Sequence, residues 1–182
     1  MRLENILALT HGKLINDPFV KNFQSIVFDV KYIKRGDLFI AFNEDMIEDA
    51  ILNGAYGVVF DKPTQISDTE IAWVQVKDCE DALKRLLRFR LIDKEIAVYK
   101  CNEIILKLAL QIITDSNFIV VHGDIKLIHK QLWDLDDKTT LLFSPSMCDE
   151  NLFTNVKDLF FGNIPSIEII EQTLFETSFI YD

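Results

Sequence analysis

The sequence is poor in arginine and cysteine, and each shortage argues against a class of protein. It has 19 Lys and Arg against 29 Asp and Glu, a net charge of −10, and no arginine after Arg90. Proteins that bind nucleic acids or anionic membranes depend on clustered basic side chains, so we expect neither partner. Its 3 cysteines have no paired spacing, which argues against a disulfide framework and against a zinc knuckle.

Long hydrophobic runs are also missing. The most apolar stretch, 104–113, contains Lys107 and falls far short of the roughly 20 apolar residues that cross a bilayer. The first residues show no apolar core followed by a small-residue cleavage site, so we expect no secretory signal. With 49% hydrophobic and 26% charged residues, the chain has the balance of a folded protein. We therefore predict a cytoplasmic protein without membrane insertion.

Short β-branched runs alternate with helical segments, and this pattern predicts an α/β fold. In the first half we expect helices over 2–9, 44–53 and 78–91 and strands over 25–28, 37–42, 56–60 and 71–76. In the second half we expect strands over 95–99, 118–122 and 139–143, helices over 103–114, 124–133 and 149–161, and closing strands within 166–181. Strands that alternate with helices of this length imply crossovers and a mainly parallel sheet. We predict two domains, 1–92 and a possibly truncated 93–182.

Two glycine-containing segments stand out in the first half, Gly36-Asp-Leu-Phe-Ile-Ala41 and Gly54-Ala-Tyr-Gly-Val-Val59. Phe28-Asp29-Val30-Lys31 precedes them, and the leucine-rich stretch 74–87 follows. Together these segments resemble the N-terminal domain of the Mur ligases, the ATP-dependent amide-forming enzymes that build the peptidoglycan stem peptide. The resemblance covers residues 1 to about 91, and it is greatest to the ligases that add D-alanyl-D-alanine to UDP-N-acetylmuramoyl-tripeptide.

The resemblance implies a uridine nucleotide site around Asp29, Lys31 and Asn43. Lys31 stands where the family has arginine, so the charge is kept but the planar fork that binds phosphate is lost. Val30 replaces the family's serine and removes a hydroxyl, and the family's Asp-Gly-His loop is missing before 44–53. We therefore expect only weak binding of a UDP-N-acetylmuramoyl-peptide, with a Kd on the order of 0.1–1 mM.

The resemblance also implies a glycine-rich phosphate loop after the strand 95–99, and the sequence there departs from the family. Lys100-Cys-Asn-Glu103 contains no glycine, and Glu103 would repel a phosphate. Lys138-Thr-Thr140 imitates the end of such a loop but follows two aspartates. Residues 92–182 also carry 7 basic against 15 acidic side chains. We therefore expect no ATP, no other cofactor and no catalytic residue.

Three further features each have a functional and a structural interpretation. His122-Gly123-Asp124 supplies either a base or a metal ligand, or a turn in which Asp124 caps a helix. Cys148, near the start of an expected helix, is either a thiol of lowered pKa or a buried side chain. The cluster from Lys84 to Arg90 contacts an anion or is a solvated helix face. We favour the structural interpretation in each case and expect no metal site.

Two functions remain open from the sequence. The first is a non-catalytic Mur-ligase-like protein of bacterial peptidoglycan synthesis, with a weak UDP-sugar-peptide site and protein partners among the cell-wall enzymes. The second is a protein-interaction module that kept the fold and lost its ligand chemistry. A competent ligase would require the missing phosphate loop to come from elsewhere.

Overall fold

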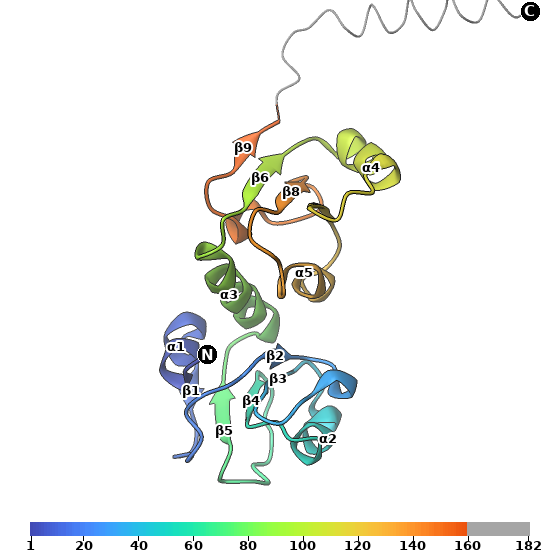
Figure 1. Cartoon of the computed structure of the whole chain (residues 1–182). Helices are drawn as coiled ribbons and strands as arrows, with labels where there is room; N and C mark the ends of the chain where they lie inside the picture. Colours follow the sequence, from blue (N-terminus) through green and yellow to red (C-terminus); the bar gives the residue numbers. More distant parts are fainter. Residues whose placement is uncertain (160–182) are drawn as a thin grey trace, which may run out of the picture.

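The computed structural model describes residues 1–159, which form two β-sheets joined by one long helix, α3 (Cys79–Ile92) (Figure 1). The first sheet has the strand order β1-β5-β4-β3-β2, and only the β1–β5 pair is antiparallel. Its strands are β1 (Lys13–Leu14), β2 (Ile26–Val27), β3 (Leu38–Ala41), β4 (Gly57–Phe60) and β5 (Ala72–Gln75). The helices of this half are α1 (Leu3–Thr10), α2 (Ile47–Leu52) and the short 3-10 turns Val30–Tyr32 and Glu44–Met46.

Helices cover both faces of the first sheet. Alternate residues of β3 point to opposite sides, so that Leu38 and Ile40 pack with α1 and α3 while Phe39 and Ala41 pack with α2. All four residues of β3 and all four of β4 are buried in consequence. A central parallel strand covered on both faces is apolar throughout, as these segments are.

The glycines of the second motif have separate structural reasons. Gly54 ends α2 with a φ of 101°, a conformation that side chains with a Cβ atom rarely adopt. Gly57 begins β4 where the ring of Phe23 lies so close that a Cβ atom would stand 2.7 Å from it. The two glycines of this motif are therefore explained by a helix end and a close packing contact, and not by a phosphate-binding loop.

The second sheet has the order β7-β8-β6-β9, and all its pairs are parallel. Its strands are β6 (Ala97–Lys100), β7 (Phe118–Val121), β8 (Thr140–Phe143) and β9 (Lys157–Asp158). Its helices are α4 (Glu103–Ile112) and α5 (Ile125–Leu132). One face packs against α5 and the end of α3, and the other packs against α4.

Helix α3 contributes to the cores of both sheets. Asp78 caps it by accepting a hydrogen bond from the backbone N–H of Asp81 (2.9 Å). Leu83 and Leu86 pack in the core of the first sheet, whereas Leu87 and Leu91 pack in the core of the second. One helix therefore packs against both sheets and connects their cores.

The α/β class is confirmed, and every expected strand of residues 1–143 is present within two residues of its expected bounds. The helix expected over 149–161 is wrong. That segment contains a 3-10 turn (Glu150–Leu152) and then β9, which pairs with β6. Asn155 has a φ of 56°, which ends any helix before it, and Phe153 is buried against Phe143 with ring centroids 4.9 Å apart. The apolar spacing of this stretch therefore reflects tertiary packing and not helical periodicity.

The remaining parts of the fold compare with the sequence predictions as follows: one strand is additional, and two predictions are not tested. Strand β1 was not expected from the sequence, because two residues are too short to show a pattern. The closing strands expected within 166–181 lie outside the described residues. The division into two domains at residue 92 stays a prediction. No helix within residues 1–159 has the length and apolar character needed to cross a membrane.

Candidate functional site

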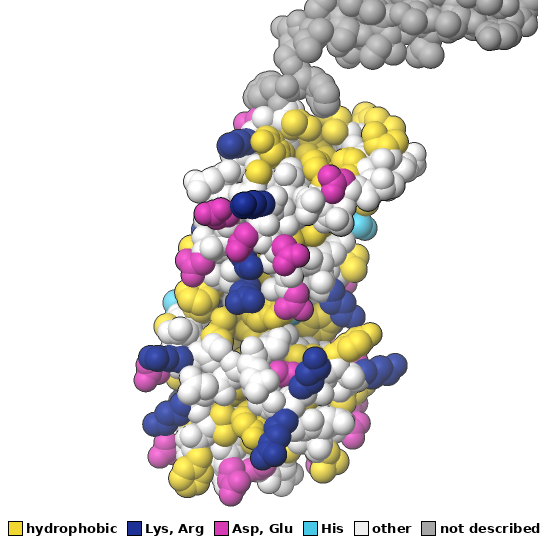
Figure 2. Space-filling model, in the orientation of Figure 1, with side chains coloured by type: hydrophobic (Ala, Val, Ile, Leu, Met, Phe, Trp, Pro, Cys, Tyr) yellow, Lys and Arg dark blue, Asp and Glu magenta, His cyan; other side chains and the backbone are white. Residues whose placement is uncertain are grey.

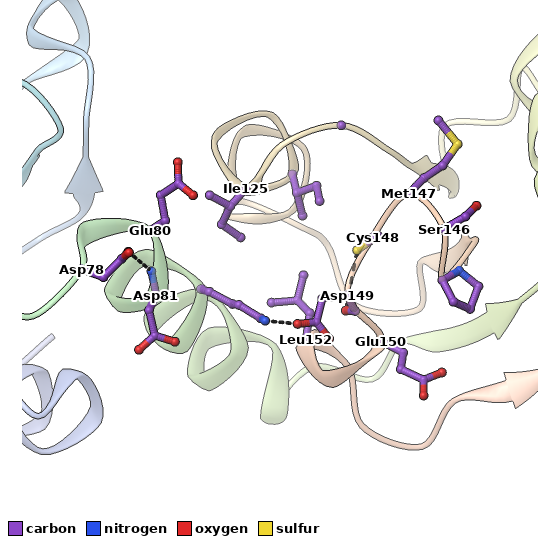
Figure 3. A pocket seen from close by; sticks show the side chains of 14 residues that line it. Asp78, Glu80, Asp81, Ile125, Ser146, Met147, Cys148, Asp149, Glu150 and Leu152 are labelled. Carbon is purple, nitrogen blue, oxygen red and sulfur yellow. Dashed lines mark hydrogen bonds and ion pairs between the residues drawn. The ribbon is translucent and has the colours of Figure 1, made fainter.

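Two large cavities differ in charge. The larger, about 750 Å³, lies between the start of α3, the start of α5 and the loop 145–152; we call it the acidic cavity. Figure 3 shows Asp78, Glu80 and Asp81 on one side of it and Asp149 and Glu150 on the other. The cation that lines this cavity, Lys84, is already paired with Asp149. Surplus negative charge makes the acidic cavity unsuitable for a phosphate.

The second cavity, about 680 Å³, has the opposite character, and we call it the lysine cavity. The segment 24–34 and Asp37 form one wall, and four residues at the end of α5 and just beyond it form the other. Lys31, Lys34 and Lys130 all line it with exposed side chains, and none of them forms an ion pair within residues 1–159. Uncommitted ammonium groups around one concavity suit an anionic ligand.

The structure brings together two of the three residues proposed from the sequence. Asp29 and Lys31 both line the lysine cavity, in the turn that follows β2. Asn43 does not line it; its side chain caps the next 3-10 turn by accepting a hydrogen bond from the backbone N–H of Asp45 (3.3 Å). Val30 packs against the apolar cluster on the α2 side of the sheet, so no polar group stands at its position.

The two carboxylates of the first-sheet wall are bound by backbone groups. Asp37 is 3% exposed, and its two oxygens accept hydrogen bonds from the N–H groups of Ser25 (3.1 Å) and Lys34 (2.9 Å). Asp29 accepts one from the N–H of Lys31 (3.2 Å). Carboxylates with backbone partners hold the turns that position the lysines, and part of their charge is compensated by the N–H dipoles.

Aromatic rings form part of the lysine cavity and join its two walls. The Nζ of Lys130 lies 5.4 Å from the ring centroid of Phe28 and 5.8 Å from that of Tyr32. His129 stacks on Trp133 with centroids 4.6 Å apart and meets Phe28 edge-on at 5.4 Å. The cavity thus offers cations beside flat apolar surfaces, and Tyr32, which is 65% exposed, presents ring surface on which a planar group can stack.

Burial sets the charge of the histidine in this cavity. His129 is 4% exposed, and its Nε2 has no hydrogen-bond partner within the described part of the chain. Burial lowers the pKa of His129 to about 4, so the ring is neutral at pH 7. The positive charge of the cavity at neutral pH therefore comes from its lysines.

The connection between β6 and α4, where the resemblance implies a phosphate loop, is occupied by internal bonds. The side chain of Asn102 accepts a hydrogen bond from the backbone N–H of Ile105 (2.9 Å), and the N–H of Cys101 donates to the carbonyl of Phe143 (2.9 Å). Glu103 stands in the first turn of α4 and pairs with Lys107. The N–H groups that would hold a phosphate are thus partly taken by this chain itself.

The other candidate residues make contacts within the fold. Asp124 caps α5 by accepting a hydrogen bond from the N–H of Leu127 (2.8 Å), as the structural interpretation expects. Nδ1 of His122 lies 3.0 Å from the carbonyl oxygen of Val120. Burial, with the adjacent Asp149 carboxylate, raises the pKa of the Cys148 thiol to about 11, so a lowered pKa is wrong. Within residues 1–159 no three His, Cys, Asp or Glu side chains are grouped to hold a metal ion.

The sequence interpretation missed the second wall of the lysine cavity. His129, Lys130 and Trp133 come from α5 and its end, about a hundred residues after Asp29. The indole N–H of Trp133 donates to the hydroxyl of Ser25 (3.0 Å) and so attaches this wall to the first sheet. One signal was available: His, Lys and Trp at positions 129, 130 and 133 are spaced to share a helix side.

Comparison with known proteins gives a likeness of fold. No protein-family model matches the sequence, and no curated protein sequence matches it. Among solved structures, the MurF of Acinetobacter baumannii is similar to 79% of this chain, with a TM-score of 0.54 and 18% identity. A UDP-N-acetylmuramoylalanyl-D-glutamyl-2,6-diaminopimelate–D-alanyl-D-alanyl ligase structure from the same organism is similar over 79%, with a TM-score of 0.53 and 18% identity.

The match covers 35% of the length of each of these ligases, so the chain corresponds to about a third of them. It extends beyond residue 91, the end of the resemblance seen in the sequence, because 79% of this chain is aligned. The resemblance itself is confirmed: over most of its length, this chain has the fold of part of a Mur ligase.

Proposed function

We propose that this chain is a non-catalytic Mur-ligase-like protein of peptidoglycan synthesis that binds the nucleotide part of a UDP-N-acetylmuramoyl-peptide in the lysine cavity. The observation that carries the proposal is the grouping of Lys31, Lys34 and Lys130 around one concavity beside exposed aromatic surface. The ligase structures of similar fold include one whose name specifies a UDP-N-acetylmuramoyl substrate.

The chemistry of the lysine cavity fits a nucleoside diphosphate. A diphosphate carries the negative charge that uncommitted ammonium groups attract, and a uracil ring supplies a flat face for Tyr32. Lysine binds phosphate as a point charge without the geometry of arginine, and Val30 offers no hydroxyl. Asp29 and Asp134 also line the cavity and oppose an anion. These opposing contributions explain why we expect a Kd of only about 0.1–1 mM.

The first test is a titration of the full chain with UDP, followed by backbone amide chemical shifts. We expect shifts at residues 24–34 and at the end of α5, which line the lysine cavity. Lys31→Ala and Lys130→Ala should each weaken binding roughly fivefold, because each removes one partly solvated charge contact. Lys13→Ala is the matched control: this exposed lysine lies on β1, at the opposite edge of the sheet from β2.

The outcomes of this titration separate the two functions left open by the sequence. An interaction module without ligand chemistry predicts no shift at ten-millimolar UDP, and that result would end the nucleotide proposal. Shifts confined to the acidic cavity, or an equal loss of affinity in Lys13→Ala, would likewise contradict the site. A uridine titration shows whether the diphosphate contributes, since uridine lacks the charge that the lysines attract.

The non-catalytic part of the proposal is tested separately with ATP. We expect calorimetry of the full chain with ATP and Mg²⁺ to show no binding at micromolar concentrations. The support is the connection between β6 and α4, where Asn102 caps the helix and Glu103 adds a negative charge. Micromolar ATP binding would overturn this part without affecting the UDP site.

A further inference from the structure

One side of α4 is apolar and uncovered within residues 1–159. Ile104, Leu108 and Ile112 are 71%, 54% and 73% exposed, and their spacing of four places them in one line along the helix. We call these three residues the α4 stripe. Glu103 and Lys107, the charged residues of α4, form an ion pair with each other. The helix therefore carries no net charge next to the stripe. Figure 2 shows hydrophobic side chains gathered in this region, at the upper end of the described part of the chain.

The described part of the chain ends next to this helix. The N–H of Leu159 donates to the carbonyl of Lys100 (2.8 Å), just before α4 begins. The side chain of Leu159 packs against the cluster that contains Leu106 and Ala109, the inward residues of α4. Leu159 therefore lies beside the face of the sheet that α4 covers.

The residues that follow have a composition suited to an apolar surface. Residues 160–182 contain 11 hydrophobic residues among 23, with 4 acidic and no basic side chains. We propose that residues 164–180 of this chain pack over the α4 stripe. Four connecting residues span roughly 13 Å when extended, and α4 itself is about 15 Å long, so the segment reaches the whole stripe.

Tethering favours this segment over other occupants. A segment attached by a short connection has an effective concentration in the millimolar range, well above that of a partner in solution. Three side chains on a ten-residue helix are also few for a second copy, because a stable dimer needs about 800 Å² from each partner. A tethered segment needs less area, since its attachment has already removed most of its translational freedom.

Photo-cross-linking of the full chain tests this packing directly. With p-benzoylphenylalanine in place of Leu108, we expect irradiation to join position 108 to residues 164–180 of the same chain. The control carries the same group at Leu52 on α2, which is 84% exposed and lies on the other sheet. Cross-links between two chains would show a second copy on the stripe and overturn the proposal, as would their absence at position 108.

Limited chymotrypsin digestion provides an independent measurement. The triple variant Ile104→Ser, Leu108→Ser, Ile112→Ser should speed cleavage at Phe175 about tenfold, because the segment loses its apolar contact. Exposed Leu52→Ser is the control and should leave the rate unchanged. Far-UV circular dichroism verifies that the variant remains folded, which we expect since the three side chains contribute little to the core. Equal cleavage rates in the variant and the unsubstituted chain would refute the packing.

Discussion

Lowering the pH from 7 to 4 should remove about 3 kcal/mol from the free energy of unfolding, through His129 alone. Burial lowers the pKa of His129 from 6.5 to about 4 in the folded protein. Between these two values the unfolded chain binds the proton and the folded chain does not, so stability falls as the pH falls. The gap between 6.5 and about 4, at about 1.4 kcal/mol per pH unit, sets an upper limit of between three and four kcal/mol, and about 3 kcal/mol of it is lost by pH 4, where the folded histidine is itself half protonated. Below pH 4 both states bind the proton and this effect stops.

Urea denaturation at several pH values between 7 and 4, on the unsubstituted chain and on His129→Phe, measures this effect. The variant should lose the dependence that comes from this residue. At pH 7 it should be at least as stable, because a phenyl ring fits between Phe28 and Trp133 and removes a buried nitrogen that has no partner within residues 1–159. Equal pH dependence in the two proteins would rule out His129 as the source.

Trp133→Ala should lower the free energy of unfolding by about 3 kcal/mol, since this ring links the two sheets. Trp133 packs against the apolar clusters of both sheets and stacks on His129. Its indole N–H donates to Ser25 (3.0 Å), and the guanidinium of Arg90 lies 5.7 Å from its ring. The change removes all of these contacts and opens a gap at the end of α5.

Trp133→Phe is the matched control, because it keeps a ring on His129 and loses the hydrogen bond to Ser25 with only part of the packed ring area. Its cost should be about 1 kcal/mol. In Trp133→Ala the remaining tryptophan, Trp73, is buried in the first sheet and reports on that sheet alone. Fluorescence and circular dichroism should then give separate unfolding midpoints. If Trp133→Ala is as stable as Trp133→Phe, the ring does not couple the sheets.

The parts of the fold that the sequence predicts are those with local signals. β3 and β4 are buried on both faces, and their sequences are therefore unbroken apolar runs. α3 has both an aspartate cap and leucines at helical spacing. The segment after Asp149 begins with an aspartate cap as well, but its structure is set by distant contacts. Phe153 packs on Phe143 in β8, and residues 157–158 pair with β6, contacts that no local pattern reveals.

The residues of the lysine cavity also fall into those with a local sequence signal and those placed by tertiary contacts. Asp29 and Lys31, which stand beside a motif, line the same cavity, whereas Asn43 does not, because strand ends that are adjacent in sequence need not open into one cavity. Lys130 and Trp133 could not be assigned, since their place depends on how α5 packs against the first sheet. Predicting that wall requires the arrangement of the two sheets, which is a property of the tertiary structure.

The continuity of α3 determines how this molecule can move. Its 14 residues contain neither glycine nor proline, so the segment between the sheets has no hinge of its own. A rotation of one sheet against the other would have to pull α3 out of one of the two cores in which it packs and also separate Trp133 from Ser25. The two walls of the lysine cavity therefore keep their spacing before any ligand arrives. Association should follow a single kinetic phase whose rate is set by encounter, with no slower closing step after it.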